Sequence, residues 1–491
     1  MLNHLIILQV IIPLLGAPCC LIIGRARAAW FFALLVSAVT FLIACQLLLQ
    51  VYDLGSISYE MGGFPAPWGI EYRLDLLSAW LLVIVSLSSL VSLTAAQTSI
   101  QKEIAPDKQL FFYVAWLLCL AGLLGILATG DAFNVFVFLE VSSLSTYTLI
   151  ALGKRREALW AAFRYLIMGT IGATFILIGI GFMYMMTGTL NMADLAQRLP
   201  EVKDSHSVFV AYTFVVVGIG LKMAMFPLHF WLPKAYSEAP SIATAFLAAS
   251  STKVAVYLLI RFTYTVFDGQ LENASLPLAD ILIVLGVLAV FSASTTAIFQ
   301  RNIKTAIAYS SVAQIGYMII GIGIGSALGL QATLLHLFNH ALIKGALFLS
   351  LAAMVYRLGS SNIEALNGLG KRMPITSLSF TVGGLSLIGV PLTVGFVSKW
   401  YLVSAAIESG RWPLALLIVL GSLLALAYIW RVVESMYFKE SEADAPTGEA
   451  PLLMLAPLWL LIAANVYFGI DTRLPVAITA EAARSLLEGI R

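Results

Sequence analysis

The chain consists mainly of apolar stretches that are long enough to cross a lipid bilayer. Crossing about 30 Å of hydrocarbon takes roughly 20 helical residues. About fourteen such stretches recur, near 3–23, 28–50, 75–97, 110–129, 132–152, 162–187, 208–235, 241–266, 278–300, 303–326, 328–356, 374–407, 412–438 and 451–470. Sixty per cent of the residues are hydrophobic and 11% are charged, which excludes a soluble globular protein. The sequence therefore predicts an all-α polytopic membrane protein.

Basic residues are distributed unequally between the two sets of loops. Lys and Arg that flank a span are retained in the cytoplasm. One set contains Arg25, Arg27, Lys102, Lys108, Lys154, Arg155, Arg156, Lys234, Arg301, Lys304, Arg357, Lys371, Arg372 and Lys439, and the other little beyond Arg73, Arg198, Lys203 and Arg411. We therefore expect a multi-pass protein of a bacterial or archaeal inner membrane, with an even number of spans and both termini on the outer side. Residues 474–491 are too polar to cross and are expected on the surface.

Two spans are interrupted by proline beside a lysine. In the run 217–241, Lys222 precedes Pro227 by five residues. The run 389–395 contains Pro391, and Lys399 follows this proline by eight residues, just beyond the run. Proline removes a backbone donor, which a membrane tolerates only where protein or water satisfies the freed carbonyls. A pair of interrupted, charged segments indicates two repeats that meet at a transport site.

The two interruptions divide the chain into predicted units. We expect an N-terminal three-helix segment with an outer loop (1–104), a first repeat (105–267), a second repeat (268–438), and a final span with a surface segment (439–491). Each repeat contains five spans, an odd number. The two repeats should therefore cross the membrane in opposite directions, as inverted repeats.

Glu140 is the one clear carboxylate within the apolar spans, whereas lysines occur there at 222, 253, 344 and 399. Burial disfavours the charged form of an isolated lysine, and a nearby carboxylate restores it. We infer that Glu140 pairs with Lys222, and that breaking the pair lets Lys222 release a proton. The alternatives are a static ion pair between two helices, or lysines at 222 and 399 that extend to the interface.

His336, His340 and Lys344 follow one another at intervals of four residues, which places them on one helix face. Such a column of protonatable groups suits a proton relay, because histidine titrates near neutrality. Hydrogen bonding within the bundle is the alternative. A metal site needs a further ligand, and none is near in sequence, so no metal is expected. Lys253 follows Ser250, Ser251 and Thr252 and would connect the two halves.

Three other residues have open or peripheral roles. His229 lies at the first interruption and serves either gating or packing. Arg261 and Arg431 lie near span ends, where we expect them to extend to the interface.

The sequence predicts no electron-carrying cofactor. Its four cysteines, Cys19, Cys20, Cys45 and Cys119, lie in apolar helices without ligand spacing. It contains no glycine-rich turn between a strand and a helix that would bind a flavin or a nicotinamide. Whether the parent complex is an enzyme stays open, because a subunit without a redox centre can belong to a transporter or to an oxidoreductase.

Four segments resemble a known family. The runs KMAMFPLHFWLPKAYSEAPS, RNIKTAIAYSSVAQIGYMIIG, HLFNHALIK and FVFLEVSSLSTY are similar to those of the antiporter-like subunits shared by complex I, membrane-bound hydrogenases and Mrp-type Na⁺/H⁺ antiporters. The resemblance covers residues 105–435 best. The run GTLNMADLA and the lack of a long C-terminal lateral helix look most similar to Mrp-type D subunits.

The resemblance implies fourteen helices with two inverted five-helix units. It also implies a key pair of Glu140 and Lys222, a hydrophilic axis through Lys253 and the histidine column, and Lys399 as the terminal lysine. Several relatives have a glutamate at that last position, so Lys399 does not separate the subunit types.

Two functions are therefore expected. The first is a membrane subunit of a multisubunit antiporter that exchanges a monovalent cation, Na⁺, for H⁺. The second is a proton-pumping subunit of an NADH:quinone oxidoreductase or hydrogenase. In both, the partners are a homologous antiporter-like subunit, small membrane subunits and lipid, and not nucleic acid. A third hypothesis, a purely structural subunit, predicts that neutralising the buried charges leaves transport intact.

Overall fold

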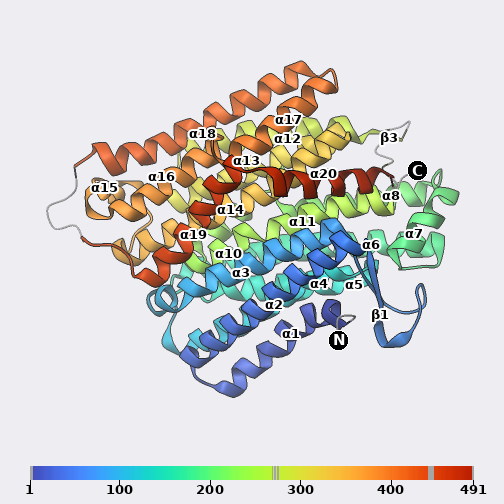
Figure 1. The fold of residues 1–491 in the computed structure, drawn as a ribbon, viewed down its shortest axis with the longest axis horizontal. Coiled ribbons are helices and arrows are strands. Elements are labelled where there is room, and N and C mark those ends of the chain that lie inside the picture. The colour runs from blue at the N-terminus through green and yellow to red at the C-terminus, as the bar shows by residue number, and fades with distance from the viewer. Residues whose placement is uncertain (1–3, 268, 270–271, 274–275, 441–446, 489–491) are drawn as a thin grey trace.

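The computed structural model describes residues 4–267, 269, 272–273, 276–440 and 447–488, which form a bundle of roughly aligned helices (Figure 1). Thirteen described helical segments are long and apolar enough to cross a membrane: α1 (Leu5–Ile23), α2 (Ala26–Leu54), α3 (Leu76–Glu103), η3 with α4 (Pro106–Ala128), α5 (Ala132–Ala151), α6 (Arg156–Thr187), α8 (His206–Met223), α10 to η5 (Ser241–Val266), α12 (Leu278–Ile298), α13 (Ile303–Ile324), α14 (Ala327–Leu358), α18 (Trp412–Phe438) and α19 (Leu452–Ile470). A fourteenth crossing consists of α16 (Pro374–Ile388) and α17 (Val394–Glu408). The predicted polytopic fold is confirmed.

Two other crossings consist of more than one element. The crossing Ser241–Val266 is made of α10 (Ser241–Ala249), α11 (Ser251–Ile260) and the π-helix η5 (Arg261–Val266), and the crossing Pro106–Ala128 of the turn η3 (Pro106–Lys108) and α4 (Gln109–Ala128). The short elements between crossings are α7 (Met192–Arg198), α9 (Leu232–Glu238), α15 (Leu369–Arg372), η2 (Met61–Gly63), η4 (Leu199–Val202) and η6 (Ile363–Leu366), and α20 (Arg473–Glu488) follows the last crossing. The strands are β1 (Ile57–Glu60), β2 (Glu71–Leu74), β3 (Glu272–Asn273) and β4 (Leu276–Pro277), which form two antiparallel pairs, β1 with β2 and β3 with β4.

One end of the bundle carries the β1–β2 hairpin, and we call it the hairpin side. The start of α1, the end of α20 and α7 lie toward this same end (Figure 1). The Nδ1 atom of His4 contacts the hydroxyl of Tyr59 in β1 at 3.1 Å. The opposite end, which we call the basic side, carries Lys102 and Arg357 in the last turns of α3 and α14, and Lys154 in the connection after α5. An even number of crossings places the start of the first crossing and the end of the last crossing at the same end of the bundle.

The two predicted repeats have matching local geometry. Asp131 forms an isolated antiparallel bridge with Asn191, and Asn302 forms one with Asn362. The sequence offset from Asp131 to Asn302 equals the offset from Asn191 to Asn362. The first residues of α6 and α14 have this same offset, and each of the two helices has 32 residues. Asp131 and Asn302 also cap α5 and α13, since each side chain accepts a backbone N–H three residues later.

Three crossings are broken within the bundle. The helix α8 ends before Ala224, whose φ is +60°, and α16 ends before Gly389, whose φ is +95°. Both breaks coincide with the proline runs singled out in the sequence. The third break, at Ser250 between α10 and α11, has neither proline nor glycine, and the sequence did not reveal it.

Close approach of small residues holds the helices of each unit together. In α6 and α8, a Cβ atom added to Gly218 would lie 2.6 Å from the carbonyl oxygen of Gly172. In α12 and α13, a Cβ added to Gly316 would lie 2.6 Å from the carbonyl oxygen of Gly286. Within lipid, the hydrophobic effect does not favour association of one helix with another. Close van der Waals packing of this kind therefore supplies much of the free energy that holds the helices together.

The last helix, α20, is amphipathic. Its buried side chains include Ile478, Ala482 and Leu486, and it packs against α14 and α3. Gln331 of α14 donates a hydrogen bond to the carbonyl of Val476 at 3.3 Å. Its charged residues face away from the bundle, which agrees with a segment too polar to cross alone.

Candidate functional site

Glu140 and Lys222 form the predicted ion pair. Glu140 lies on α5 and Lys222 on the last turn of α8, and Glu140 Oε1 is 3.7 Å from Lys222 Nζ. Lys222 also donates a hydrogen bond of 2.7 Å to the hydroxyl of Ser143, one turn beyond Glu140 on α5. The Lys222 side chain is 6% exposed and that of Glu140 is 27% exposed, so the pair reaches from the bundle interior toward its surface.

Lys253 lies in the first turn of α11, which follows the break at Ser250, and it is fully buried. Its ammonium donates hydrogen bonds to the carbonyl of Ala248 and to the hydroxyl of Thr252. The carbonyl of Ala248 is available because the break frees carbonyls at the end of α10 from helical bonding. The break thus supplies the polar environment that a lysine needs inside a membrane.

Aromatic residues separate Lys222 from Lys253. Tyr147 of α5 packs edge to face against Tyr165 of α6, with ring centroids 4.7 Å apart. The ring of Tyr165 stacks on Trp231 at 3.9 Å, and its hydroxyl lies near Ser251, at the start of α11. Two buried tyrosines therefore connect the neighbourhood of Ser143, which binds Lys222, with the start of α11, which carries Lys253.

His336, His340 and Lys344 form the predicted column on α14. The two imidazole rings are nearly parallel, with centroids 5.9 Å apart and an interplanar angle of 11°. Neither ring nitrogen of His340 has a hydrogen-bond partner among the described residues. Lys344 Nζ donates to Ser310 Oγ at 2.5 Å and to the carbonyl of Ile307 at 2.7 Å, both on α13. Lys253 donates to the Ala248 carbonyl of α10, and α10 packs against α14, which places Lys253 near the column.

Lys399 continues the row on α17 and does not extend to the interface. It is 6% exposed, and its ammonium donates to the carbonyls of Leu387 and Ile388 at 3.0 and 2.8 Å. These carbonyls are freed where α16 ends. The ammonium also lies 5.1 Å from the ring centroid of Tyr317, whose edge packs against His336. His336 also contacts Ser398, with Nδ1 and Oγ 2.9 Å apart.

The structure therefore brings all seven predicted residues into one polar row. The row runs from Glu140 and Lys222 through Lys253, beside the end of α10, to Lys344, His340, His336 and Lys399. The sequence did not identify Ser143, Ser310, Ser398 or Tyr317, whose only sequence signal is a polar atom within an apolar span. The roles of the seven residues in transport stay predictions.

Two other residues singled out in the sequence differ in outcome. His229 is 5% exposed, and its ring stacks on those of Phe226 and Phe230 at the first break, which supports the packing role. The expectation that Arg261 extends to the interface is wrong. Arg261 is 9% exposed and forms two short contacts with Asp75, because the start of α3 places a carboxylate against it.

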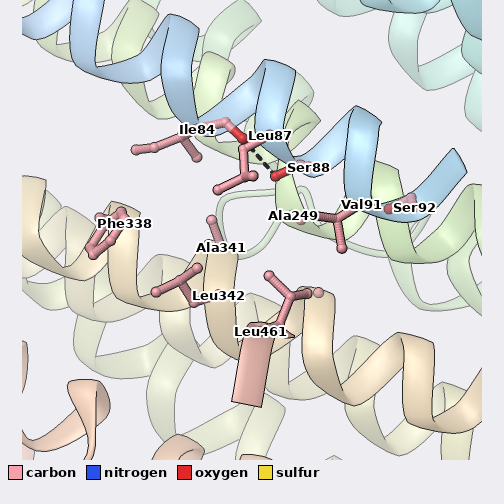
Figure 2. A pocket seen from close by; sticks show the side chains of 11 residues that line it. Ile84, Leu87, Ser88, Val91, Ser92, Ala249, Phe338, Ala341, Leu342 and Leu461 are labelled. Atoms are coloured by element: carbon pink, nitrogen blue, oxygen red, sulfur yellow. Dashed lines mark hydrogen bonds between the residues drawn. The ribbon is translucent and has the colours of Figure 1, made fainter. Parts of the chain in front are cut away.

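Two cavities of the described structure lie outside the row. Figure 2 shows apolar side chains of α3, α14 and α19 around a cavity of about 20 Å³, where Ser88 donates to the carbonyl of Ile84. Helical periodicity places its lining residues Phe338 and Ala341 on the face of α14 opposite the histidines. A larger recess of about 940 Å³ opens on the basic side. Lys304 lines it, with its ammonium 3.9 Å from Glu103.

Known proteins share this architecture. The family described as NADH:quinone oxidoreductase/Mrp antiporter, TM, matches residues 129–425. The chain is 42% identical to the N subunit of the NADH-quinone oxidoreductase of Desulforudis audaxviator, over 95% of this chain and 96% of the relative. It is 28% identical to the D subunit of the Na⁺/H⁺ antiporter of Bacillus subtilis, over 99% and 97%.

A solved structure agrees with the sequence comparisons. A chain of the Mrp complex from Dietzia sp. superposes with a TM-score of 0.90 at 25% identity, covering 99% of this chain and 97% of that one. The family match spans more than half of the chain and includes every residue of the row, from Glu140 to Lys399. The chain therefore belongs to the NADH:quinone oxidoreductase/Mrp antiporter transmembrane family.

Proposed function

We propose that this protein is the proton-translocating membrane subunit of a multisubunit Na⁺/H⁺ antiporter. The observation that carries the proposal is the row of titratable side chains, which connects two broken helices through the bundle interior. Ionisable groups at membrane depth cost roughly 2.5–3.5 kcal/mol each even on the lenient insertion scale. A purely structural subunit would not need such a series.

Protons move along the row as each group changes partners. Release of Lys222 from Glu140 lowers the proton affinity of Lys222, because the carboxylate stabilises the charged form of the lysine. The tyrosine hydroxyls and Lys253 carry the proton toward α14. The histidine rings, whose Nε2 atoms have no hydrogen-bond partner in the described part of the chain, pass it along the column. It then reaches Lys399, which is held by carbonyls at the second break.

The Na⁺ assignment is supported by likeness to antiporter subunits. The relative in Bacillus subtilis is named as the D subunit of a Na⁺/H⁺ antiporter, and the Dietzia chain belongs to an Mrp complex. By that likeness, the partners are a homologous antiporter-like subunit and small membrane subunits. The inner membrane of a bacterium or archaeon is the proposed location, with the hairpin side and both termini facing outward because the basic loops lie at the other end.

The repeat boundaries at 105–267 and 268–438 form part of this proposal. The matching bridges and the equal lengths of α6 and α14 support it. The proposed boundary at residue 268 lies outside the described residues. In this arrangement, Lys222 precedes the break of the first unit, whereas Lys399 follows that of the second and reaches back to it.

The second candidate is a proton-pumping subunit of an NADH:quinone oxidoreductase. The identity of 42% to a relative named as the N subunit of such a complex favours it. Its proton path would use the same row, driven by electron transfer in other subunits.

Transport by the whole complex in proteoliposomes separates the two. We would impose a gradient of Na⁺, of K⁺ or of no added cation, without an electron donor, and follow internal pH with a dye. Proton movement that depends on Na⁺ alone supports the antiporter. Proton movement that requires NADH and a quinone, and is indifferent to Na⁺, replaces it with the second candidate.

A further inference from the structure

A polar line along α11 and the start of η5 leaves the row toward the hairpin side. Lys253, Tyr257 and Arg261 are spaced by four residues and share one helix face. Eight residues advance about 12 Å along a helix. Arg261 therefore stands between Lys253 and the hairpin side, at the point where a proton could leave the row early.

The Arg261 guanidinium is held in a fixed position. Its Nη1 lies 2.6 Å from Asp75 Oδ2 and its Nη2 lies 2.8 Å from Asp75 Oδ1, which is a bidentate pair. Its Nε donates to the hydroxyl of Tyr257 at 3.2 Å, and Nη1 also donates to Thr265 at 3.2 Å. The side chain is 11% exposed.

The partners of Arg261 are themselves held by other helices. Asp75 caps α3, accepting the backbone N–H of Ser78 at 2.9 Å. The hydroxyl of Tyr257 donates to the carbonyl of Leu127, on α4, at 3.4 Å. The π-helix η5 begins at Arg261, and such helices occur often at functional sites. Three transmembrane helices thus fix the position of one cation.

The orientation of the ion pair presents its positive end to the row. Arg261 contacts Tyr257 on the Lys253 side, whereas Asp75 is the more exposed partner, at 28%. A guanidinium does not deprotonate in proteins, so Arg261 cannot pass a proton onward. A fixed positive charge in a narrow polar path repels protons and cations.

We propose that Arg261 is a fixed-charge barrier that prevents protons from leaving Lys253 toward the hairpin side, with Asp75 as its positioning residue. The proposal rests on the proposed function, because it assumes that Lys253 carries protons. A proton on Lys253 is then directed to Lys344 and the histidines, which keeps proton movement coupled to exchange.

The test measures passive proton leak through the whole complex in proteoliposomes, as the decay of an imposed pH difference without Na⁺ on either side. For Arg261→Gln we expect about a tenfold faster leak, from the Coulomb interaction of unit charges about 12 Å apart at an effective dielectric constant of about 20. Arg261→Lys keeps the charge and should leak like the unaltered complex. Asp75→Asn keeps the guanidinium and should also leak little, although it weakens the clamp.

A matched control tests the same chemical change elsewhere. Arg411 pairs with Asp280 at 3.0 Å in an exposed position at the ends of α18 and α12, so Arg411→Gln should not leak. If Arg261→Gln fails to assemble, the double variant Asp75→Asn/Arg261→Gln removes both charges and leaves none unpaired. Its leak should also rise about tenfold.

Two results would overturn the barrier. One is a leak that stays unchanged in Arg261→Gln and in the double variant. The other is an equal leak in Arg261→Gln, Arg261→Lys and Asp75→Asn, which indicates a purely structural clamp. If the leak of Arg261→Gln is unchanged and the unaltered complex exchanges Na⁺ for H⁺, only the barrier is refuted. If the leak of Arg261→Gln is raised but the unaltered complex shows no Na⁺-dependent exchange, the antiporter assignment is refuted and the barrier stands.

Discussion

Replacing Glu140 by glutamine tests the first step of the proposed path. Two unit charges 3.7 Å apart interact by about 4 kcal/mol at an effective dielectric constant of about 20. The Glu140 side chain is 27% exposed, and solvent screening reduces this to about 2–3 kcal/mol. About 1.4 kcal/mol corresponds to a factor of ten in an equilibrium constant. The substitution therefore shifts the equilibrium between charged and neutral Lys222 toward the neutral form by a factor on the order of fifty.

We therefore expect Glu140→Gln to slow Na⁺-driven proton movement by at least about tenfold while the complex still assembles. The assay is dye quenching in everted vesicles, normalised to the amount of assembled complex. Glu157→Gln is the matched control, because Glu157 is an exposed glutamate that contacts Arg155 at 3.7 Å. It should leave exchange unchanged.

A double-mutant cycle decides whether the two residues act as a pair. If they do, Lys222→Ala and Glu140→Gln together should slow exchange no more than the worse single variant, since each alone removes the same interaction. Exchange by Glu140→Gln within twofold of the unaltered rate, in fully assembled complex, would refute the reasoning. So would losses that simply multiply in the double variant.

Three further predictions concern the column, the packing and the hairpin side. His336→Ala should slow exchange and alter its pH dependence, because it removes a titratable imidazole from the row together with its contact to Ser398; a pH profile identical to that of the unaltered complex would remove His336 from the path. Gly218→Leu should destabilise the α6–α8 contact by about 1–3 kcal/mol, seen as a lower melting temperature of the purified complex, and an unchanged temperature would contradict the packing argument. Burial raises the pKa of the Asp75 carboxyl, but the Arg261 charge and the hydrogen bonds from Ser78 outweigh burial and lower it to about 2. A carboxyl with a lowered folded-state pKa stabilises the fold above its unfolded pKa of about 4 and loses that contribution as the pH falls through the folded value. Melting temperatures should therefore fall between about pH 4 and 2 more steeply in the unaltered complex than in Asp75→Asn, and equal slopes would contradict the assignment.

The residue types along the chain were sufficient to predict the crossings and the members of the row. Apolar length determines where a helix can span, and proline identifies two of the three breaks because it removes a backbone donor. The spacing of His336, His340 and Lys344 predicts a shared face, since α-helical geometry is local. The pairing of Glu140 with Lys222 followed from the scarcity of carboxylates within the spans.

Contacts between distant segments were decided only by the tertiary structure. Ser250 breaks a helix without any local signal, and Lys399 is anchored by carbonyls of the preceding helix segment. Arg261 looked peripheral in sequence, yet it is buried because Asp75, far away in the chain, lies opposite it. Neighbouring residues determine backbone geometry and the length of an apolar stretch. The partner of a buried charge depends instead on which helices pack together, which is a property of the whole bundle.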